Sequence, residues 1–456
     1  MALSNTGEFE VNILGSDLNA GYFNPSGASA GTDYSQSVTP ILTLADVVTN
    51  GTTTVTSATG GFTAAMVRNG INIAGTIYEI VSRSDSNTVI VDRAASAASG
   101  QSARVGGALA SPGKAAGAMT NGTRMWIKQG TYPIDLTATA NTSGGRVSLG
   151  LGESGRPTIV RGYTTTRGDQ TYPRPVLQVS TGSAGVYVVS STGNHSSIEN
   201  IVVDANAKAG NGINGGGTNL RVVRCHAKGG FAVGINTSAA TLCSAYGCTS
   251  FPIFASIAFL CASHGNSFSG FTATGDGFRY NNCISANNTG ATSDGFQFQA
   301  GAAAMNCTSY GNGRNGWTLQ NESRGSTILS SVSYNNAAWG FNVGTTYGGL
   351  KLLNVATGAN PSGAYNSSFI TDTGNMALLT ANPFDTSLIA ALGADSTIEA
   401  IFAAFSPNNV SGGGALLRGL SAMAYADIGA VQHQESGGGG SFIGSSFIPR
   451  GALNYG

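Results

Sequence analysis

The sequence predicts an all-β protein built around a parallel β-helix, a solenoid of short strands, with an N-terminal β region and a C-terminal cap and tail. Near-copies of one segment start at intervals of 22, 18, 18, 22, 24, 24 and 23 residues between Val203 and Asn354. Within the copies apolar residues alternate with period two, and Gly and Asn separate the predicted strands. A period of about 20 to 24 residues is typical of solenoids, in which each coil buries its apolar face only against the next coil.

The clearest mark of the repeat is a row of cysteines that open successive copies. The copies CHAKGG, CSAYGC, CASHGN, CISANN and CTSYGN place five residues at this ladder position: Cys225, Cys243, Cys261, Cys283 and Cys307. Alternation predicts that the residues two before and two after each ladder position share its inward face. Because five thiols cannot all pair, we expect buried, reduced cysteines that act as small apolar filler. Cys248, at an outer turn position, is the expected reactive thiol.

Asparagines occupy the sixth position of four consecutive copies, at Asn266, Asn288, Asn312 and Asn336. Stacked asparagines can satisfy the amides of a turn through side-chain ladders. A leucine-rich repeat is the main competing solenoid, but it needs a recurrent Leu pattern that this chain lacks.

Four regions follow one another along the chain. Residues 1–115 form an N-terminal β region for attachment or capping, and residues 116–370 form the β-helix, which begins with RMWIKQGTYPI. Residues 371–434 form a C-terminal cap, with one short amphipathic helix expected within 385–405 across the open end. Residues 435–456 are a Gly linker and an apolar tail with three aromatic residues, Phe442, Phe447 and Tyr455. We expect this tail either to fold back on its own chain or to dock into a neighbouring copy or another protein.

The charge and the apolar content of the chain limit which kinds of partner it is expected to bind. The 456 residues carry 22 Lys and Arg against 22 Asp and Glu, so the formal net charge gives no reason to expect nucleic-acid binding. No run of 18 apolar residues predicts a membrane span, and the N-terminus lacks the pattern of a Sec signal peptide. We expect no cofactor, and assembly in a reducing cytoplasm.

Several segments resemble right-handed parallel β-helix repeat proteins of the pectate-lyase-like group. They are MWIKQGTYPI, PTIVRGY, the coils themselves and DIGAVQ, within residues 120–432. Residues 1–115, with GTDYSQ and SNTVIVDR, resemble the N-terminal part of β-helix proteins carried by bacteriophages and environmental bacteria. The resemblance implies the fold but leaves the activity open, because such rods serve as polysaccharide lyases, hydrolases, tailspikes and structural virion proteins.

Candidate catalytic residues are few. The resemblance implies that a lyase would use a Lys or Arg base and often Ca²⁺ held by several Asp, yet no pair of carboxylates recurs on the outward row, so no metal site is predicted. Asp276 and Asp294 both precede Gly-Phe steps and are weak candidates for a hydrolase pair. Lys228 is a weak candidate for a lyase base. Each of these residue types is also common at turns and on solvated surfaces.

A row of aromatic residues offers a binding surface instead. Three residues past the ladder stand Tyr246, His264, Tyr310 and Tyr334, which alternation places on the outside. Aromatic rows suit a glycan-stacking strip or a subunit interface, although ordinary exposed β residues would give the same pattern.

The sequence therefore favours a non-catalytic structural protein of a phage virion, a capsid decoration or tail-associated β-helix that acts through protein or glycan contacts. We expect it on the virion surface, as a homo-oligomer, most simply a trimer, or bound to other virion proteins. One alternative is a polysaccharide lyase or depolymerase, either a tailspike or a secreted enzyme acting outside the cell. The other is a glycan-binding rod that uses the aromatic row.

Overall fold

The computed structural model describes residues 3, 6–26, 31–150, 152–153, 155–215, 219–299, 301–320, 325–343, 350–366, 370–372 and 376–406. Its contacts divide the chain into two compact units. Unit 1 comprises Met1–Gly210 with Asn214–Arg221, and unit 2 comprises Asn211–Ile213 with Val222–Gly456. Among the described residues, helix is confined to four short segments: η1 (Ala64–Met66), α1 (Pro112–Ala118), α2 (Thr386–Ala390) and α3 (Ile398–Ala404). None of these helices is long and apolar enough to cross a membrane.

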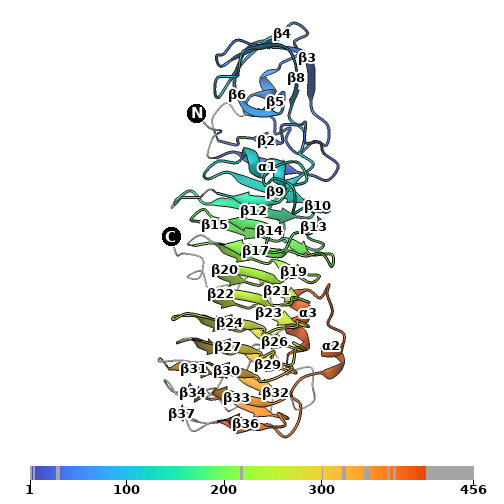
Figure 1. Cartoon of the computed structure of the whole chain (residues 1–456). Helices are drawn as coiled ribbons and strands as arrows, with labels where there is room; N and C mark the ends of the chain where they lie inside the picture. The colour runs from blue at the N-terminus through green and yellow to red at the C-terminus, as the bar shows by residue number, and fades with distance from the viewer. Residues whose placement is uncertain are drawn as a thin grey trace, which may run out of the picture. The chain divides into compact units, whose positions relative to one another are not determined.

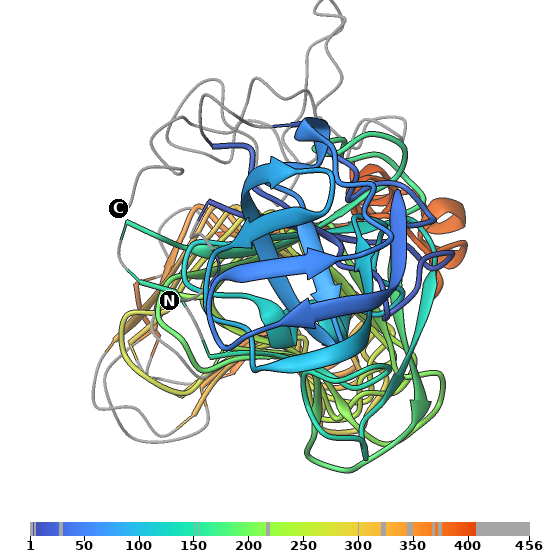
Figure 2. The same cartoon turned by 90° about the horizontal axis from the view of Figure 1, so that it is seen from above.

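Six antiparallel strands of unit 1 close into a small barrel, which is blue in Figure 2. They pair in the order β3-β4-β7-β6-β5-β8 and are β3 (Leu42–Thr49), β4 (Thr54–Ser57), β5 (Gly70–Ile73), β6 (Thr76–Asp85), β7 (Thr88–Val91) and β8 (Ala98–Val105). Apolar side chains that alternate along the strands fill the barrel, among them Val47, Val55 and Ile80. The sequence indicates β structure here but not closure, because alternation does not reveal which strands are partners.

The remaining strands of unit 1 are β-helix rungs with parallel neighbours. β1 (Glu8–Val11) pairs with β9 (Arg124–Lys128), and β9 pairs with β12 (Thr158–Tyr163), which pairs with β15 (Ser196–Glu199). The other parallel sets are β10 (Thr131–Asp135), β13 (Val176–Thr181) and β16 (Val202–Asp204), and β11 (Val147–Leu149) with β14 (Tyr187–Ser191). Only β2 (Tyr22–Phe23) runs antiparallel to β1. The expected boundary near residue 115 therefore does not hold for β1, which joins the β-helix.

Unit 2 contains parallel rungs on every side of its coils (Figure 1). The short-strand sheet consists of β19 (His226–Lys228), β21 (Ser244–Tyr246), β23 (Ala262–His264), β26 (Ile284–Ala286), β29 (Thr308–Tyr310), β32 (Val332–Tyr334), β35 (Ala356–Gly358) and β38 (Ala377–Leu378). The long strands β20 (Val233–Thr241) and β22 (Phe251–Phe259) pair with each other.

After β22 the rungs divide into two parallel series. One is β24 (Phe271–Ala273), β27 (Phe296–Phe298), β30 (Trp317–Leu319), β33 (Trp339–Val343) and β36 (Gly363–Asn366). The other is β25 (Arg279–Asn281), β28 (Ala303–Met305), β31 (Ser326–Leu329), β34 (Leu350–Leu353) and β37 (Ile370–Asp372). β17 (Asn211–Gly215) holds residues of both units, as does β18 (Arg221–Val223). Three sides of stacked parallel strands define a parallel β-helix, which confirms the predicted fold class.

Each coil turns a corner at one residue of left-handed backbone conformation directly before the ladder position. The φ angles are 52° at Arg224, 54° at Leu242, 53° at Leu260, 52° at Asn282, 53° at Asn306, 49° at Ser330 and 52° at Asn354. Asparagine tolerates this conformation better than most residues, which explains its frequency here.

The corner shifts the inward-outward alternation by one residue. Residues three before the ladder position, such as Ala258 and Tyr280, are fully buried, whereas Met305, two before it, is 40% exposed. The prediction that residues two before the ladder face inward is therefore wrong. The last copy also begins at Val355 and not at Asn354, because Val332 pairs with Ala356.

All six cysteines are buried free thiols, as expected for the ladder. They donate weak hydrogen bonds to backbone carbonyls, as Cys243 Sγ does to Val222 O at 3.3 Å. The prediction that Cys248 is reactive is wrong, because Cys248 is fully buried and burial raises the pKa of its thiol to about 12. It lies at the head of the asparagine ladder, where its backbone N–H donates to Asn266 Oδ1 at 2.8 Å.

The asparagine ladder is confirmed and is one member longer than predicted. Amide Nδ2 groups donate to the Oδ1 of the next coil at 2.9 Å (Asn266 to Asn288), 2.8 Å (Asn288 to Asn312), 2.9 Å (Asn312 to Asn336) and 3.1 Å (Asn336 to Asn360). Each amide also donates to a hydroxyl three residues earlier in its own coil, as Asn312 does to Ser309 at 2.9 Å. Because these groups are buried, every bond replaces one to water that folding removes.

Replacing Asn312 by Ala should destabilise the protein strongly. The change removes the buried side-chain bonds from Asn288 Nδ2 to Asn312 and from Asn312 to Asn336, and it leaves the backbone N–H of Asn288 without its acceptor, Asn312 Oδ1. We therefore expect a loss of about 2 to 4 kcal/mol in the free energy of unfolding. Urea titration followed by circular dichroism measures it. The matched control is Asn366→Ala, which removes an exposed amide pair with Asn342 and should cost less than about 0.5 kcal/mol. Equal losses in both variants would contradict a stabilising role for the buried ladder.

Candidate functional site

Two members of the aromatic row three residues past the ladder, Tyr310 and Tyr334, are covered by a later segment of the chain, within residues 384–405. His264, Tyr310 and Tyr334 are 2%, 5% and 8% exposed, so the predicted outward exposure is wrong for these three, and Tyr246 is half-buried. The rings of Tyr310 and Tyr334 stack with centroids 6.2 Å apart. Phe384 and Phe405 meet Tyr310 edge-on, at centroid distances of 5.9 and 5.5 Å.

The covering segment carries the two short helices α2 and α3. Asp385 caps α2 by accepting from the backbone N–H groups of Ser387 and Leu388, and Thr397 caps α3 by accepting from that of Ala400. The buried side of α3 and its flanks pack onto the short-strand sheet, next to which both helices lie in Figure 1. Helical structure within 385–405 was predicted, but the described helices cover the lateral face of the sheet and not an open end.

Polar contacts fix the same segment to β19. Lys228 Nζ lies 2.5 Å from Asp395 Oδ1, and Arg224 Nη2 lies 3.2 Å from Glu399 Oε1. His226 bonds through Nε2 to the carbonyl oxygen of Ala394 at 2.8 Å and through Nδ1 to Ser244 Oγ at 2.7 Å. The Lys228 ammonium lowers the pKa of the Asp395 carboxyl. Lys228, the weak candidate for a lyase base, is thus held in a contact between strand and covering segment.

The two candidate carboxylates have separate environments. Asp294 is fully buried and accepts from Arg314 Nε at 2.8 Å and from the backbone N–H of Asn315 at 3.1 Å. The carboxylate of Asp294 raises the pKa of the Arg314 guanidinium. Asp276 is exposed, and its Oδ1 accepts from the backbone N–H of Gly301 at 3.3 Å. The structure therefore gives Asp294 the geometry of a buried structural ion pair.

Across the described ranges no group of three or more His, Cys, Asp or Glu residues could hold a metal ion. The aromatic residues of the predicted docking tail, Phe442, Phe447 and Tyr455, lie outside the described residues.

The structure presents an apolar surface that the sequence interpretation missed. Four of the five outward side chains of β22 are large and apolar, the fifth being Ser256. Together with one residue between β23 and β24 they form what we term the β22 face: Phe251, Phe254, Ile257, Phe259 and Phe268. Ile257 is 50% exposed and the four phenylalanines are half-buried. Period-two alternation predicts that Phe259, two residues before Cys261, faces into the coil, whereas its side chain is half-buried on the outside.

Ring contacts join three members of the β22 face, Phe251, Phe254 and Phe268. The ring of Phe251 lies 6.2 Å from that of Phe254 and 5.5 Å from that of Phe268. Phe254 in turn meets the buried Phe278 at 5.8 Å. Strand pairing sets the exposed Arg279 next to Ile257, at one border of the patch. The signal in the sequence was FPIFASIAF, one copy with many more large apolar residues than its neighbour VGINTSAAT.

Comparison with known proteins leaves the activity open. No family model and no curated protein matches the chain. Among solved structures it is similar to the pectate lyase Pel9A, with 18% identity, 72% of this chain and 92% of that chain covered, and a TM-score of 0.48. It is also similar to the periplasmic alginate epimerase AlgG, with 13% identity, 57% and 77% covered, and a TM-score of 0.27. The strand pairings described above, and not these likenesses, establish the parallel β-helix.

Truncating Phe405 should detach the covering segment from the sheet. Phe405→Ala removes a buried ring that contacts Tyr310 and Phe384, and we expect a loss of about 3 to 4 kcal/mol in the free energy of unfolding. Leu388→Ala is the control in the same segment, because Leu388 is 40% exposed and should change stability by about 0.5 kcal/mol or less. Urea titration of both variants gives the comparison. If Phe405→Ala lost no more stability than Leu388→Ala, this result would contradict the packing of Phe405 against Tyr310 and Phe384.

Acid should destabilise the protein through His264. Burial, with a smaller contribution from His226, lowers the pKa of His264 to about 3. An imidazole that stays neutral when folded but protonates near pH 6.5 when unfolded costs stability as the pH falls below about 6.5, by roughly 1.4 kcal/mol per pH unit at most.

The measurement is the unfolding free energy at pH 7 and pH 5 for the wild type and His264→Phe. The variant should lose less stability between the two values, since phenylalanine fills the site without titrating. His195→Gln, at a half-buried histidine, should keep the wild-type difference. A pH dependence unchanged in His264→Phe would refute the assignment.

Proposed function

We propose that this protein is a non-catalytic structural β-helix that assembles with copies of itself through the β22 face. The observation that carries the proposal is the set of large apolar side chains on the outside of β22, three of which are in ring contact. A contiguous exposed apolar patch on a protein surface is typical of an interaction site. The phage virion predicted from the N-terminal segments is the setting in which such assembly would operate.

The chemistry of the β22 face favours a protein partner over a glycan. Four of the five outward side chains of β22 carry no polar atom, Ser256 being the exception, whereas sugar hydroxyls need hydrogen-bonding partners to replace water. Aromatic and apolar side chains at the centre, with a charged residue such as Arg279 at the rim, are typical of protein interfaces. With 22 positive and 22 negative side chains, copies of this chain have no net charge to oppose association.

A closed ring agrees with the stoichiometry expected from the sequence. If three copies associate around one axis, each buries its own β22 face at an equivalent contact. Burial of several aromatic side chains then supplies most of the association energy.

Light scattering after size-exclusion chromatography tests the proposal. The wild type should elute at a multiple of the 45.9 kDa chain mass. Ile257→Asp should elute as a monomer, because the interface would take a carboxylate out of water at a cost that pairing with the neighbouring Arg279 does not repay. Leu18→Asp is the matched control, since Leu18 is an apolar residue of unit 1 that is 59% exposed; it should keep the wild-type mass.

A monomeric wild type would contradict assembly through this face. The polysaccharide alternatives would then come first, tested by the ultraviolet absorbance of unsaturated uronate products and by retention on immobilised glycans. An oligomer that survives in Ile257→Asp would place the interface elsewhere on the chain.

A further inference from the structure

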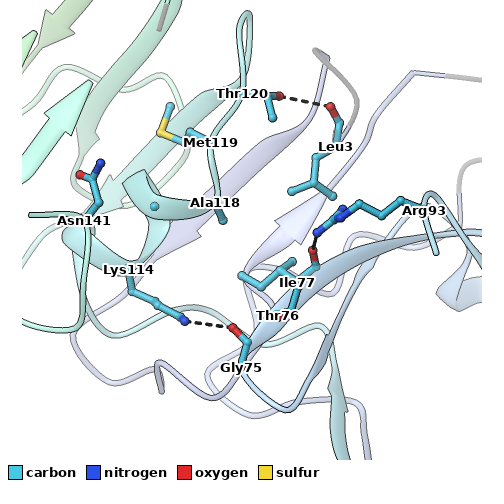
Figure 3. A pocket seen from close by; sticks show the side chains of 11 residues that line it. Leu3, Gly75, Thr76, Ile77, Arg93, Lys114, Ala118, Met119, Thr120 and Asn141 are labelled. Carbon is cyan, nitrogen blue, oxygen red and sulfur yellow. Dashed lines mark hydrogen bonds between the residues drawn. The ribbon is translucent and has the colours of Figure 1, made fainter. Parts of the chain in front are cut away.

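A polar pocket of about 420 Å³ lies within unit 1, between the barrel and α1 (Figure 3). One wall is the turn from β5 to β6, with Gly75, Thr76 and Ile77, together with Arg93. The other wall comprises α1 and the residues that follow it. Its lining residues are Leu3, Gly75, Thr76, Ile77, Arg93, Lys114, Gly117, Ala118, Met119, Thr120 and Asn141.

Lys114 brings an uncompensated positive charge to this pocket. Its Nζ donates to the carbonyl oxygen of Gly75 at 3.1 Å, the bond drawn in Figure 3. An ammonium group has three donors, so two remain for a ligand. Lys114 forms no ion pair with any carboxylate in the part of the chain that the structure describes.

The other polar groups of the pocket are mostly engaged. Arg93 Nη1 lies 2.7 Å from Asp92 Oδ2, and its Nη2 donates to the carbonyl oxygen of Ile77, so its charge is largely balanced. Thr120 Oγ1 donates to the carbonyl oxygen of Leu3 at 3.2 Å. Lys114 therefore decides the sign of the charge that the pocket favours.

A second hollow, of about 660 Å³, adjoins the first and shares Lys114 and Asn141 with it. Its acidic member, Asp17, forms no ion pair with Lys114 among the described residues. Its carboxylate oxygens accept from the backbone N–H of Ala110 at 3.0 Å and from Ser111 Oγ at 2.6 Å. The side chains of Ser16, Thr142 and Ser143 add hydroxyl groups to the lining. The Ser143 hydroxyl donates to Asp17 and that of Thr142 to the carbonyl oxygen of Thr139, so both oxygens remain as acceptors for a ligand. One lysine thus stands between two hydroxyl-lined hollows.

We infer that Lys114 is the centre of a binding site for a small organic anion with a hydroxylated body. Hollows of this size match small organic molecules and exceed what a single inorganic ion fills. The Lys114 ammonium would pair with the anionic group through charge-assisted hydrogen bonds. The hydroxyl groups around it would contact the polar body of the ligand. The anionic group is a carboxylate or a phosphate, and both are within the chemistry of an ammonium donor.

Isothermal titration of the full chain with three matched probes tests this site. Gluconate carries a carboxylate, glucose 6-phosphate carries a phosphate, and glucose is the neutral control. At low salt, one of the two anions should bind saturably and glucose should not. Lys114→Met should weaken that binding roughly tenfold or more, because a hydrogen bond to a charged group is lost. Lys208→Met, at an exposed lysine of the same unit that lines neither hollow, should bind like the wild type.

The three probes and two variants separate the outcomes. Tighter binding of gluconate assigns a carboxylate ligand, and tighter binding of glucose 6-phosphate assigns a phosphate ester. Equal affinities of the wild type and Lys114→Met for the anion would overturn the site, provided that the variant keeps the wild-type melting temperature. Binding of glucose as tight as that of the anions, or no saturable binding of either anion, would also overturn it. None of these results depends on the mass of the assembly, so the test is independent of the proposed function.

Discussion

The stacking of one coil directly on the next is the constraint on which the rest of unit 2 depends. Parallel strands lie about 4.8 Å apart, so every inward side chain touches the same position of the neighbouring coil. The interior is narrow, and a side chain fits only if its neighbours above and below leave it room. Ladders of like residues are the solution that recurs throughout this unit.

Three such ladders fill the unit in different ways. Aromatic rings stack from Phe271 to Phe296 at 5.0 Å, and from Phe296 to Trp317 at 4.0 Å. The cysteines fill the side of the interior where little volume is free. The asparagines satisfy the hydrogen-bonding groups of the turn. At Gly316 even a methyl group would be too large, since a Cβ there would lie 2.0 Å from Ser333 Oγ. The glycine that recurs before the second strand is therefore a packing requirement.

The outward apolar surfaces of the coils differ in whether the chain itself covers them. The short-strand sheet carries aromatic side chains that α3 and its flanks cover, so this apolar surface is satisfied within the chain. The β22 face carries a comparable set of aromatic side chains, and its Ile257 is 50% exposed. The contrast between a covered and an uncovered apolar surface is the physical basis for proposing that a second copy meets β22.

The sequence by itself determined the fold class, the buried thiols and most of the asparagine ladder, because coil period and inward residue type repeat in every copy. Tertiary structure alone decided where outward residues lie. The left-handed corner before each ladder position shifts the alternation, which turned Phe259 and Met305 outward. Burial of Tyr310 and Tyr334 depends on Phe384 and Phe405, which lie far along the chain and outside the repeat. A periodic pattern predicts the contacts between neighbouring coils. It carries no information on which distant segment packs against the outer surface of the coils.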